Sequence, residues 1–226
     1  MLRSEDITKV RRFDELTALK GLFILVIVLH NSMLVTPAVL ERVPGMDFIA
    51  LFGGNLGNSM FFLLSGFGMF YGYRGRIQAH EIPFNAYFGR KLAKLYPMYL
   101  ISNLASLLLG IIQWGPSAIN LQRIIRTSLL GLGGGLPGEG PYNAPTWFLG
   151  TLMLCYALFY LLCYHVRTTT GYHCAVALSI VFGCACMTGE SALPFCGSGT
   201  GTGILNFFLG CALGEALPQL RERGGK

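Results

Sequence analysis

The chain has 226 residues, of which 53% are hydrophobic and only 12% are charged, and its mean hydropathy is +0.53. An average soluble domain has about 25% charged residues. This composition excludes an ordinary soluble domain and predicts an all-α membrane protein, a polytopic bundle of helices. The net charge of +6 is explained by membrane orientation and contact with anionic lipid, without a nucleic-acid partner.

We expect residues 1–19 to form a polar cytoplasmic arm, because they are charged and lack the early apolar region of a removable signal peptide. A spanning helix needs about 20 mostly apolar residues. Six later segments approach this description and are predicted to span the membrane, roughly 20–37, 55–73, 95–113, 147–165, 173–189 and 202–218. Residues 219–226 then form a cytoplasmic tail.

The connections between these segments are predicted from their breakers and charges. We expect an outer loop over 38–54 and a basic inner loop over 74–94, after which Pro97 helps to open the third helix. Glycine-rich stretches at 131–146 and 197–203 are predicted to be outer loops. Segment 121–132 is too short and too charged to span, so it is expected to lie in the interface or to re-enter the membrane.

Basic residues set the predicted orientation, since Lys and Arg accumulate in cytoplasmic loops. With six spans and a cytoplasmic N-terminus, all but three of the 17 basic residues fall on the cytoplasmic side; the exceptions are Arg42, Arg123 and Arg126. Both termini are therefore expected in the cytoplasm of a multi-pass plasma-membrane protein.

His30 stands inside an otherwise apolar run. It lies ten residues after Lys20, about 15 Å along a helix and half of a hydrocarbon core of about 30 Å. An ionisable group at that depth is costly and usually functional. A neutral imidazole there could act as a general base toward a hydroxyl. The alternative is a histidine that only hydrogen-bonds to a neighbouring helix.

A basic cluster at the start of the third span is the second candidate. Arg90, Lys91 and Lys94 lie at its inner mouth, and such clusters hold polyphosphates through charge-assisted hydrogen bonds. A lipid-facing anchor is an equally good interpretation of these residues and of Lys20.

Other reactive residue types favour packing over chemistry. Ser59 and Ser65 lack the G-x-S-x-G pattern of a nucleophile elbow. The seven cysteines fall mostly in apolar spans without metal-ligand spacing, so we expect small apolar filler and no metal site. Trp147 is expected to be an interfacial aromatic anchor.

Four ordered blocks resemble the signatures of the acyltransferase-3 family of integral membrane acyltransferases. The first pairs a basic residue before glycine, Lys20, with a histidine one helix later, His30. The others are the phenylalanine pair with Ser-Gly-Phe in 57–67, the basic block ending in proline at 84–97, and Trp-Phe-Leu in 145–149. The family usually has Arg where Lys20 stands and often an acid after the tryptophan block, which is absent here.

The resemblance implies an acyltransferase domain over 20–218 that moves an acyl group, with acetyl expected, from cytoplasmic acyl-CoA to a hydroxyl of a cell-envelope glycan. It implies that His30 is catalytic and that Lys20, Arg90, Lys91 and Lys94 hold the donor, with no permanently bound cofactor. Family members normally have several more spans. Alternatives are therefore a fragment, an inactive truncated copy, or a non-catalytic transporter or anchoring and sensing module of the same architecture.

Overall fold

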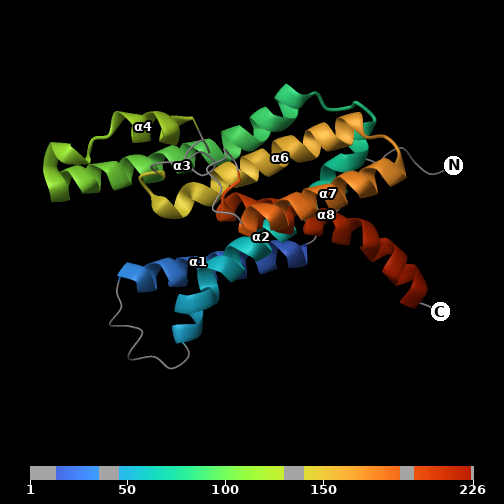
Figure 1. Cartoon of the computed structure of the whole chain (residues 1–226), viewed down its shortest axis with the longest axis horizontal. Helices are drawn as coiled ribbons and strands as arrows, with labels where there is room; N and C mark the ends of the chain where they lie inside the picture. The colour runs from blue at the N-terminus through green and yellow to red at the C-terminus, as the bar shows by residue number, and fades with distance from the viewer. Residues whose placement is uncertain (1–13, 36–45, 130–139, 189–195, 225–226) are drawn as a thin grey trace.

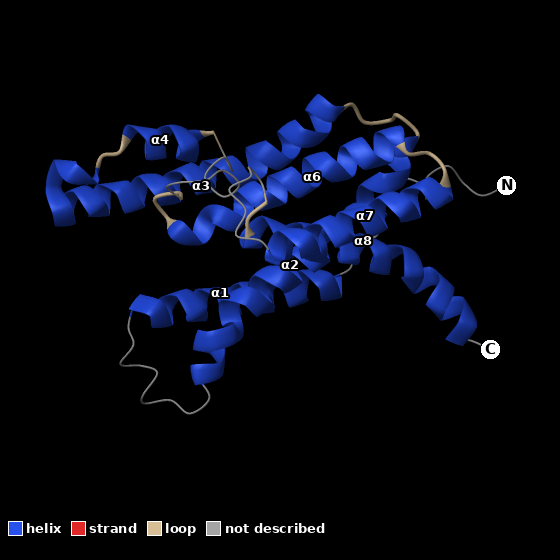
Figure 2. Ribbon diagram, in the orientation of Figure 1, coloured by secondary structure: helices blue, strands red, loops and turns tan. Residues whose placement is uncertain are grey.

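The computed structural model describes residues 14–35, 46–129, 140–188 and 196–224, and every regular element in these ranges is helical (Figure 2). The expected all-α fold is confirmed. The α-helices are α1 (Asp14–Val35), α2 (Met46–Gln78), α3 (Phe84–Trp114), α4 (Leu121–Ser128), α6 (Trp147–His165), α7 (Thr169–Thr188) and α8 (Ser198–Gly224), with 3₁₀ turns η2 (Gly115–Ala118) and η3 (Ala144–Thr146).

The length and composition of the helices are those of a membrane protein. Within the described residues, four segments are long and apolar enough to cross a membrane: Met46–Gln78, Phe84–Ala118, Ala144–His165 and Thr169–Thr188. Helix α1 has a shorter apolar stretch, Ala18–Ser32. On α3, Ile112 is 82% exposed and Leu109 is 65% exposed, which suits contact with lipid. The number of six spans and the cytoplasmic location of both termini stay predictions.

The core lies where α2, α6 and α8 meet. Phe62, Phe159 and Phe207, one from each helix, are fully buried. Glycines allow α2 and α8 to touch through their backbones, because a Cβ at Gly66 would collide with the carbonyl of Phe207 and one at Gly210 with the carbonyl of Leu63. Small residues allow such close approach between membrane helices. Figure 1 shows α2, α6 and α7 gathered around α8, with α1 against α2 at one edge of the bundle and α3 beside α6 at the other.

One ion-pair cluster joins α2, α7 and α8. Arg74 Nη1 donates to Glu215 Oε1 over 2.7 Å, and His173 Nε2 lies 3.0 Å from Glu215 Oε2. The guanidinium of Arg74 also stacks 3.8 Å from the ring centroid of Tyr172. These contacts fix the register of the three helices at the end of the bundle where α2 ends.

Three predicted boundaries are wrong. Helix α2 begins at Met46, so residues 46–54 are not loop. Helix α3 begins at Phe84, which places Pro97 inside it; the added turns pack on α6, where Tyr87 Oη donates to the carbonyl of Tyr156 over 3.0 Å. Helix α8 begins at Ser198 because Gly199, Gly201 and Gly203 each face a neighbouring helix closely. A sequence window reads such glycines and prolines as breakers, whereas membrane packing keeps them helical.

The ends of the chain and two connections are only partly described. Residues 1–13, 36–45, 130–139 and 189–195 lie outside the described ranges, and with them most of the expected N-terminal arm and outer loops. Helix α1 begins at Asp14, so the last residues of the expected arm are helical. Helix α8 runs to Gly224, so most of the expected tail is helical as well.

The expected interfacial or re-entrant segment is α4, which folds back along α3 (Figure 1). The chain reverses at Gly115, whose φ is +68°, a value that glycine adopts without strain. At its far end, the carbonyl of Ser128 accepts a hydrogen bond from Tyr96 Oη over 2.6 Å. This bond ties the end of α4 to the middle of α3, and the interfacial or re-entrant placement of the segment stays a prediction.

Candidate functional site

His30 lies where α1 crosses a glycine-rich face of α2. A Cβ added at Gly53 would stand 3.2 Å from His30 Cβ, and one at Gly54 would stand 2.5 Å from His30 Nε2. One turn further along, Gly57 faces Ile27 and the backbone of Phe23. The glycines therefore admit the imidazole between the helices, where any larger residue would displace it.

One hydrogen bond defines the tautomer of His30. Its Nδ1 lies 3.2 Å from the carbonyl oxygen of Ile49 in the first turn of α2. A carbonyl oxygen can only accept, so Nδ1 carries the proton. In the neutral ring Nε2 then keeps its lone pair. This is the arrangement that a general base requires, with the second nitrogen held by an orienting acceptor.

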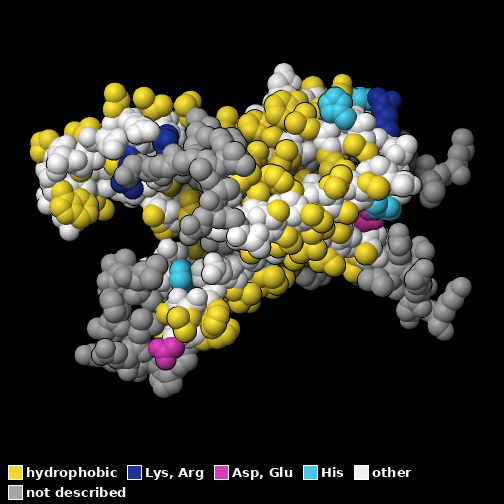
Figure 3. All heavy atoms as spheres, in the orientation of Figure 1, with side chains coloured by type: hydrophobic (Ala, Val, Ile, Leu, Met, Phe, Trp, Pro, Cys, Tyr) yellow, Lys and Arg dark blue, Asp and Glu magenta, His cyan; other side chains and the backbone are white. Residues whose placement is uncertain are grey.

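His30 borders a cavity of about 180 Å³ whose wall is rich in amides. The cavity is lined by Ile27, His30, Asn31, Leu51, Gly54, Asn55, Asn58, Pro145 and Trp147. The Oδ1 atom of Asn58 is buried and has no hydrogen-bond partner among the described residues, which leaves it able to accept a bond from a ligand hydroxyl. Figure 3 shows the molecule hollowed between its α1–α2 part and its α3–α4 part.

Trp147 has a different setting from the one expected. Instead of serving only as an interfacial anchor, it lines the cavity of His30. A Cβ at Gly199 would stand 2.7 Å from the Trp147 ring, so the indole packs directly against the first turn of α8. The first turn of α6 is thereby fixed beside α1 and α2.

The structure brings together three of the four basic residues expected to bind an anion. Lys20 lies within electrostatic range of Lys91 and Lys94, and its Nζ would be 3.9 Å from a Cβ at Gly68. Arg90 is exposed on α3 and makes no described contact with them. No carboxylate among the described residues pairs with the three ammonium groups. Like charges gathered in this way favour a polyanionic ligand, which offsets their repulsion.

Tyrosines hold the central lysine of this cluster. Lys91 Nζ lies 4.2 Å from the ring centroid of Tyr73 and 5.2 Å from that of Tyr156. Tyr156 in turn shares a hydrogen bond with Ser65. Ser65 is buried, and Cys155, Cys163 and Cys211 are fully buried in the hydrophobic core, which agrees with the packing role expected for them.

Sequence reasoning missed Asn55, Asn58 and Tyr73. The two asparagines are three residues apart on a glycine-rich helix, so they share one face, and that spacing could have marked them. Tyr73 carried no such signal, because its contact with Lys91 joins two helices.

The histidine and the lysines occupy different depths of the bundle. Lys20 and His30 lie ten residues apart on one continuous helix, a rise of about 15 Å. His30 is level with the first turn of α6, whereas Lys91 lies beside Tyr156 in the middle of that helix. An extended ligand is needed to connect the two.

A family model described as "Acyltransferase domain" matches residues 13–226. The chain belongs to the acyltransferase-3 family. Membership implies acyl transfer in general and agrees with the membrane character of the helices. No curated protein and no solved structure matches the chain. In this acyltransferase-3 protein the histidine cavity and the lysine cluster are the candidate sites for the reaction.

Proposed function

We propose that this membrane acyltransferase takes an acyl group, with acetyl expected, from acyl-CoA and transfers it to a hydroxyl of a cell-envelope glycan. The observation that carries the proposal is the setting of His30. Its Nδ1 is held by the Ile49 carbonyl, and it borders an amide-lined cavity. This leaves Nε2 as a base in a family whose members transfer acyl groups.

In the proposed reaction, His30 Nε2 removes the proton of the acceptor hydroxyl as its oxygen attacks the thioester carbonyl. The carbon–sulfur bond then breaks, the acyl group remains on the acceptor oxygen, and the imidazolium returns its proton to the departing thiolate. Amide groups of Asn55 and Asn58 can orient the acceptor and the carbonyl, because neutral amides both donate and accept.

The lysine cluster is the proposed site for the phosphates of the donor. Lys20, Lys91 and Lys94 converge without a described carboxylate partner, and ammonium groups bind phosphate through charge-assisted bonds. The long arm of coenzyme A separates its phosphates from its thioester, which fits two sites at different depths. With the predicted orientation the donor enters from the cytoplasm and the acceptor from the outer side.

A turnover assay tests the proposed function. The purified protein in detergent is expected to release free coenzyme A from acetyl-CoA, with the acetyl label recovered on an added envelope glycan fraction. If the protein remains helical and monodisperse but neither binds nor turns over acyl-CoA, the proposal is contradicted. That result would favour a transporter or anchoring module.

Replacing Lys91 with Gln is expected to raise the KM for acyl-CoA about tenfold and to leave kcat nearly unchanged, because a bond from a charged group contributes about 1.5–3 kcal/mol. Initial rates over a range of acyl-CoA concentrations measure both constants. Arg76→Gln is the matched control, since Arg76 is an exposed cation paired with Glu81 over 3.5 Å. Equal KM values in the two variants would remove Lys91 from the donor site.

Replacing Gly54 with Ala is expected to lower kcat about 10²-fold, because a displacement of about 1 Å at a catalytic group can have that effect. The added Cβ would stand 2.5 Å from His30 Nε2. Gly72→Ala on the same helix is the control, since nothing lies within 4 Å of its Cβ position. Single-turnover rates at saturating donor separate this effect from binding, and an unchanged rate would show that His30 does not act from this position.

A further inference from the structure

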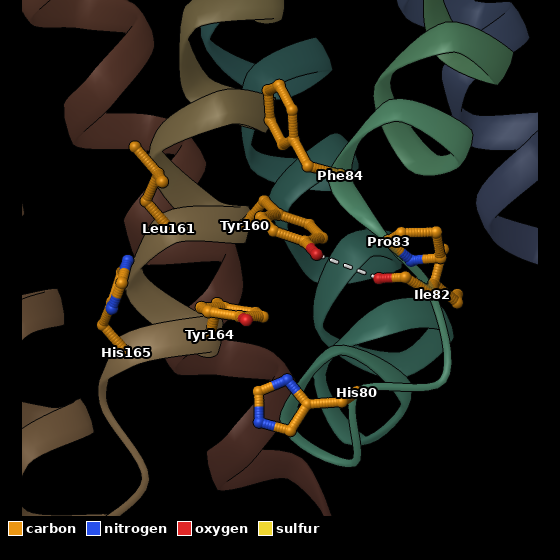
Figure 4. Close-up of a pocket in the computed structure, with 8 residues that line it drawn as sticks. All are labelled: His80, Ile82, Pro83, Phe84, Tyr160, Leu161, Tyr164 and His165. Carbon is orange, nitrogen blue, oxygen red and sulfur yellow. Dashed lines mark hydrogen bonds between the residues drawn. The ribbon is translucent and has the colours of Figure 1, made fainter.

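A second cavity, of about 400 Å³, lies on the flank of α6 where α2 connects to α3 (Figure 4). Its lining includes His80, Phe84, Leu161, Tyr164 and His165. It is far from the His30 cavity, because it borders the last turns of α6 whereas His30 lies beside the first turn. A hydrogen bond from Tyr160 Oη to the carbonyl of Ile82, 3.0 Å long, ties α6 to the connection and shapes the cavity.

The polar groups around this cavity are suited to donating hydrogen bonds. Arg167 Nη2 lies 2.6 Å from His80 Nε2. Since a guanidinium only donates, Nε2 is the acceptor and His80 carries its proton on Nδ1. His165 adds a second imidazole and Tyr164 a hydroxyl. Among the residues that the structure describes, no Asp or Glu lines the cavity; the nearby Glu81 is paired with Arg76. The donors and the cation favour an anionic ligand.

His80 occupies a left-handed backbone conformation that is uncommon for residues other than glycine. Its φ is +58°, and it is the only non-glycine residue with positive φ in the described ranges. It follows the end of α2, where Ala79 and Glu81 donate backbone bonds to Gly75 and Arg76 over 2.9 Å each. Glycine is the usual residue at such a helix end. A histidine in place of glycine at this position points to a role for its side chain.

The outer wall of the cavity is apolar and exposed. Leu161 is 48% exposed and Phe84 is 41% exposed, and both lie on helices apolar enough to cross a membrane, at the ends where those helices meet the connection. Figure 3 shows histidine and basic side chains gathered beside apolar ones at this end of the molecule. Apolar walls that face hydrocarbon beside a basic edge match the two parts of a lipid at the interface.

We propose that this cavity binds the phosphate headgroup of an anionic membrane phospholipid. His80 Nδ1 and the guanidinium of Arg167 contact the phosphate oxygens, His165 and Tyr164 lie at the headgroup, and the acyl chains run along Leu161 and Phe84. A soluble phosphate compound has no acyl chains to pack against the exposed apolar wall. A lipid is therefore the expected source of the phosphate. The proposal does not depend on the acyl-transfer reaction.

Native mass spectrometry of the full chain tests the lipid site, with dioleoylphosphatidylglycerol compared with dioleoylphosphatidylcholine in mixed micelles. We expect at least tenfold tighter binding of the anionic lipid, and its loss in His80→Gly, which relieves the backbone and should keep the thermal midpoint at or above that of the wild type. Leu161→Trp, which fills the cavity without changing charge, should also lose the lipid. Arg90→Gln, which removes an exposed cation of α3 outside the cavity lining, should retain it.

Each other outcome overturns the proposal. Equal binding of the two lipids, or retention of phosphatidylglycerol by both His80→Gly and Leu161→Trp, would show that the cavity is not a headgroup site. Displacement of the lipid by inorganic phosphate or free coenzyme A at micromolar concentrations would assign the cavity to a water-soluble phosphate compound instead.

Discussion

Replacement of His30 with Ala is expected to lower kcat for acyl transfer about 10³-fold, within the range of about 10²–10⁴ that a positioned general base contributes. The substitution removes Nε2 and leaves the acceptor hydroxyl without a base. The KM for acyl-CoA should stay close to that of the wild type, because Lys20 of the lysine cluster lies ten residues before His30 on α1, a separation of about 15 Å. Release of coenzyme A and recovery of labelled product measure the change.

Leu25→Ala is the matched control for His30→Ala. Leu25 is on the same helix and 54% exposed, so its truncation removes a similar number of atoms without reaching the cavity. Both variants should insert and purify like the wild type. Wild-type turnover by His30→Ala would refute the proposed mechanism, and equal losses in both variants would mean that α1 contributes packing alone.

Replacement of Gly66 with Ala is expected to destabilise the folded protein by about 3 kcal/mol, the upper part of the usual range for overpacking. The new Cβ would collide with the carbonyl of Phe207. That atom belongs to the backbone of α8, so it cannot turn aside as a flexible side chain could. The two helices must separate along a seam that includes Gly210. Loss of helical signal during titration with a denaturing detergent measures the change.

Gly72→Ala again serves as the control on α2. Nothing lies within 4 Å of a Cβ added at Gly72. Alanine also has a higher helix propensity than glycine, by about 1 kcal/mol. The control should therefore be as stable as the wild type or slightly more stable. Equal stability of Gly66→Ala and Gly72→Ala would show that α2 and α8 do not touch through their backbones.

The candidate site could be predicted in part from the sequence. His30 was found because an ionisable side chain is costly in lipid, so a single one in an apolar run usually has a function. Lys91 and Lys94 were found as a local run, and Lys20 was found from the spacing of the first block. Asn58, Tyr73 and the cavity role of Trp147 were missed or misread, since each depends on which helices become neighbours.

The four-block resemblance and the family match agree on acyltransferase-3, because the blocks are short local patterns that survive without knowledge of contacts. The exclusion of Arg90 from the lysine group shows the opposite case. Arg90 and Lys91 are adjacent in sequence but about 100° apart around α3. Only the tertiary structure, in which Lys91 packs against Tyr73 of α2, decides which of them faces Lys20.

The sequence by itself determined that the protein is a helical membrane protein of this family, because hydropathy and local motifs depend on residues close together in the chain. It placed α6 at 147–165, where apolar character and helix ends coincide. The tertiary structure decided that Pro97 and the glycines of 199–203 are helical, and it created both cavities. Those features depend on contacts between residues that are distant in the chain. A glycine, for example, allows close packing only where a second helix lies against it.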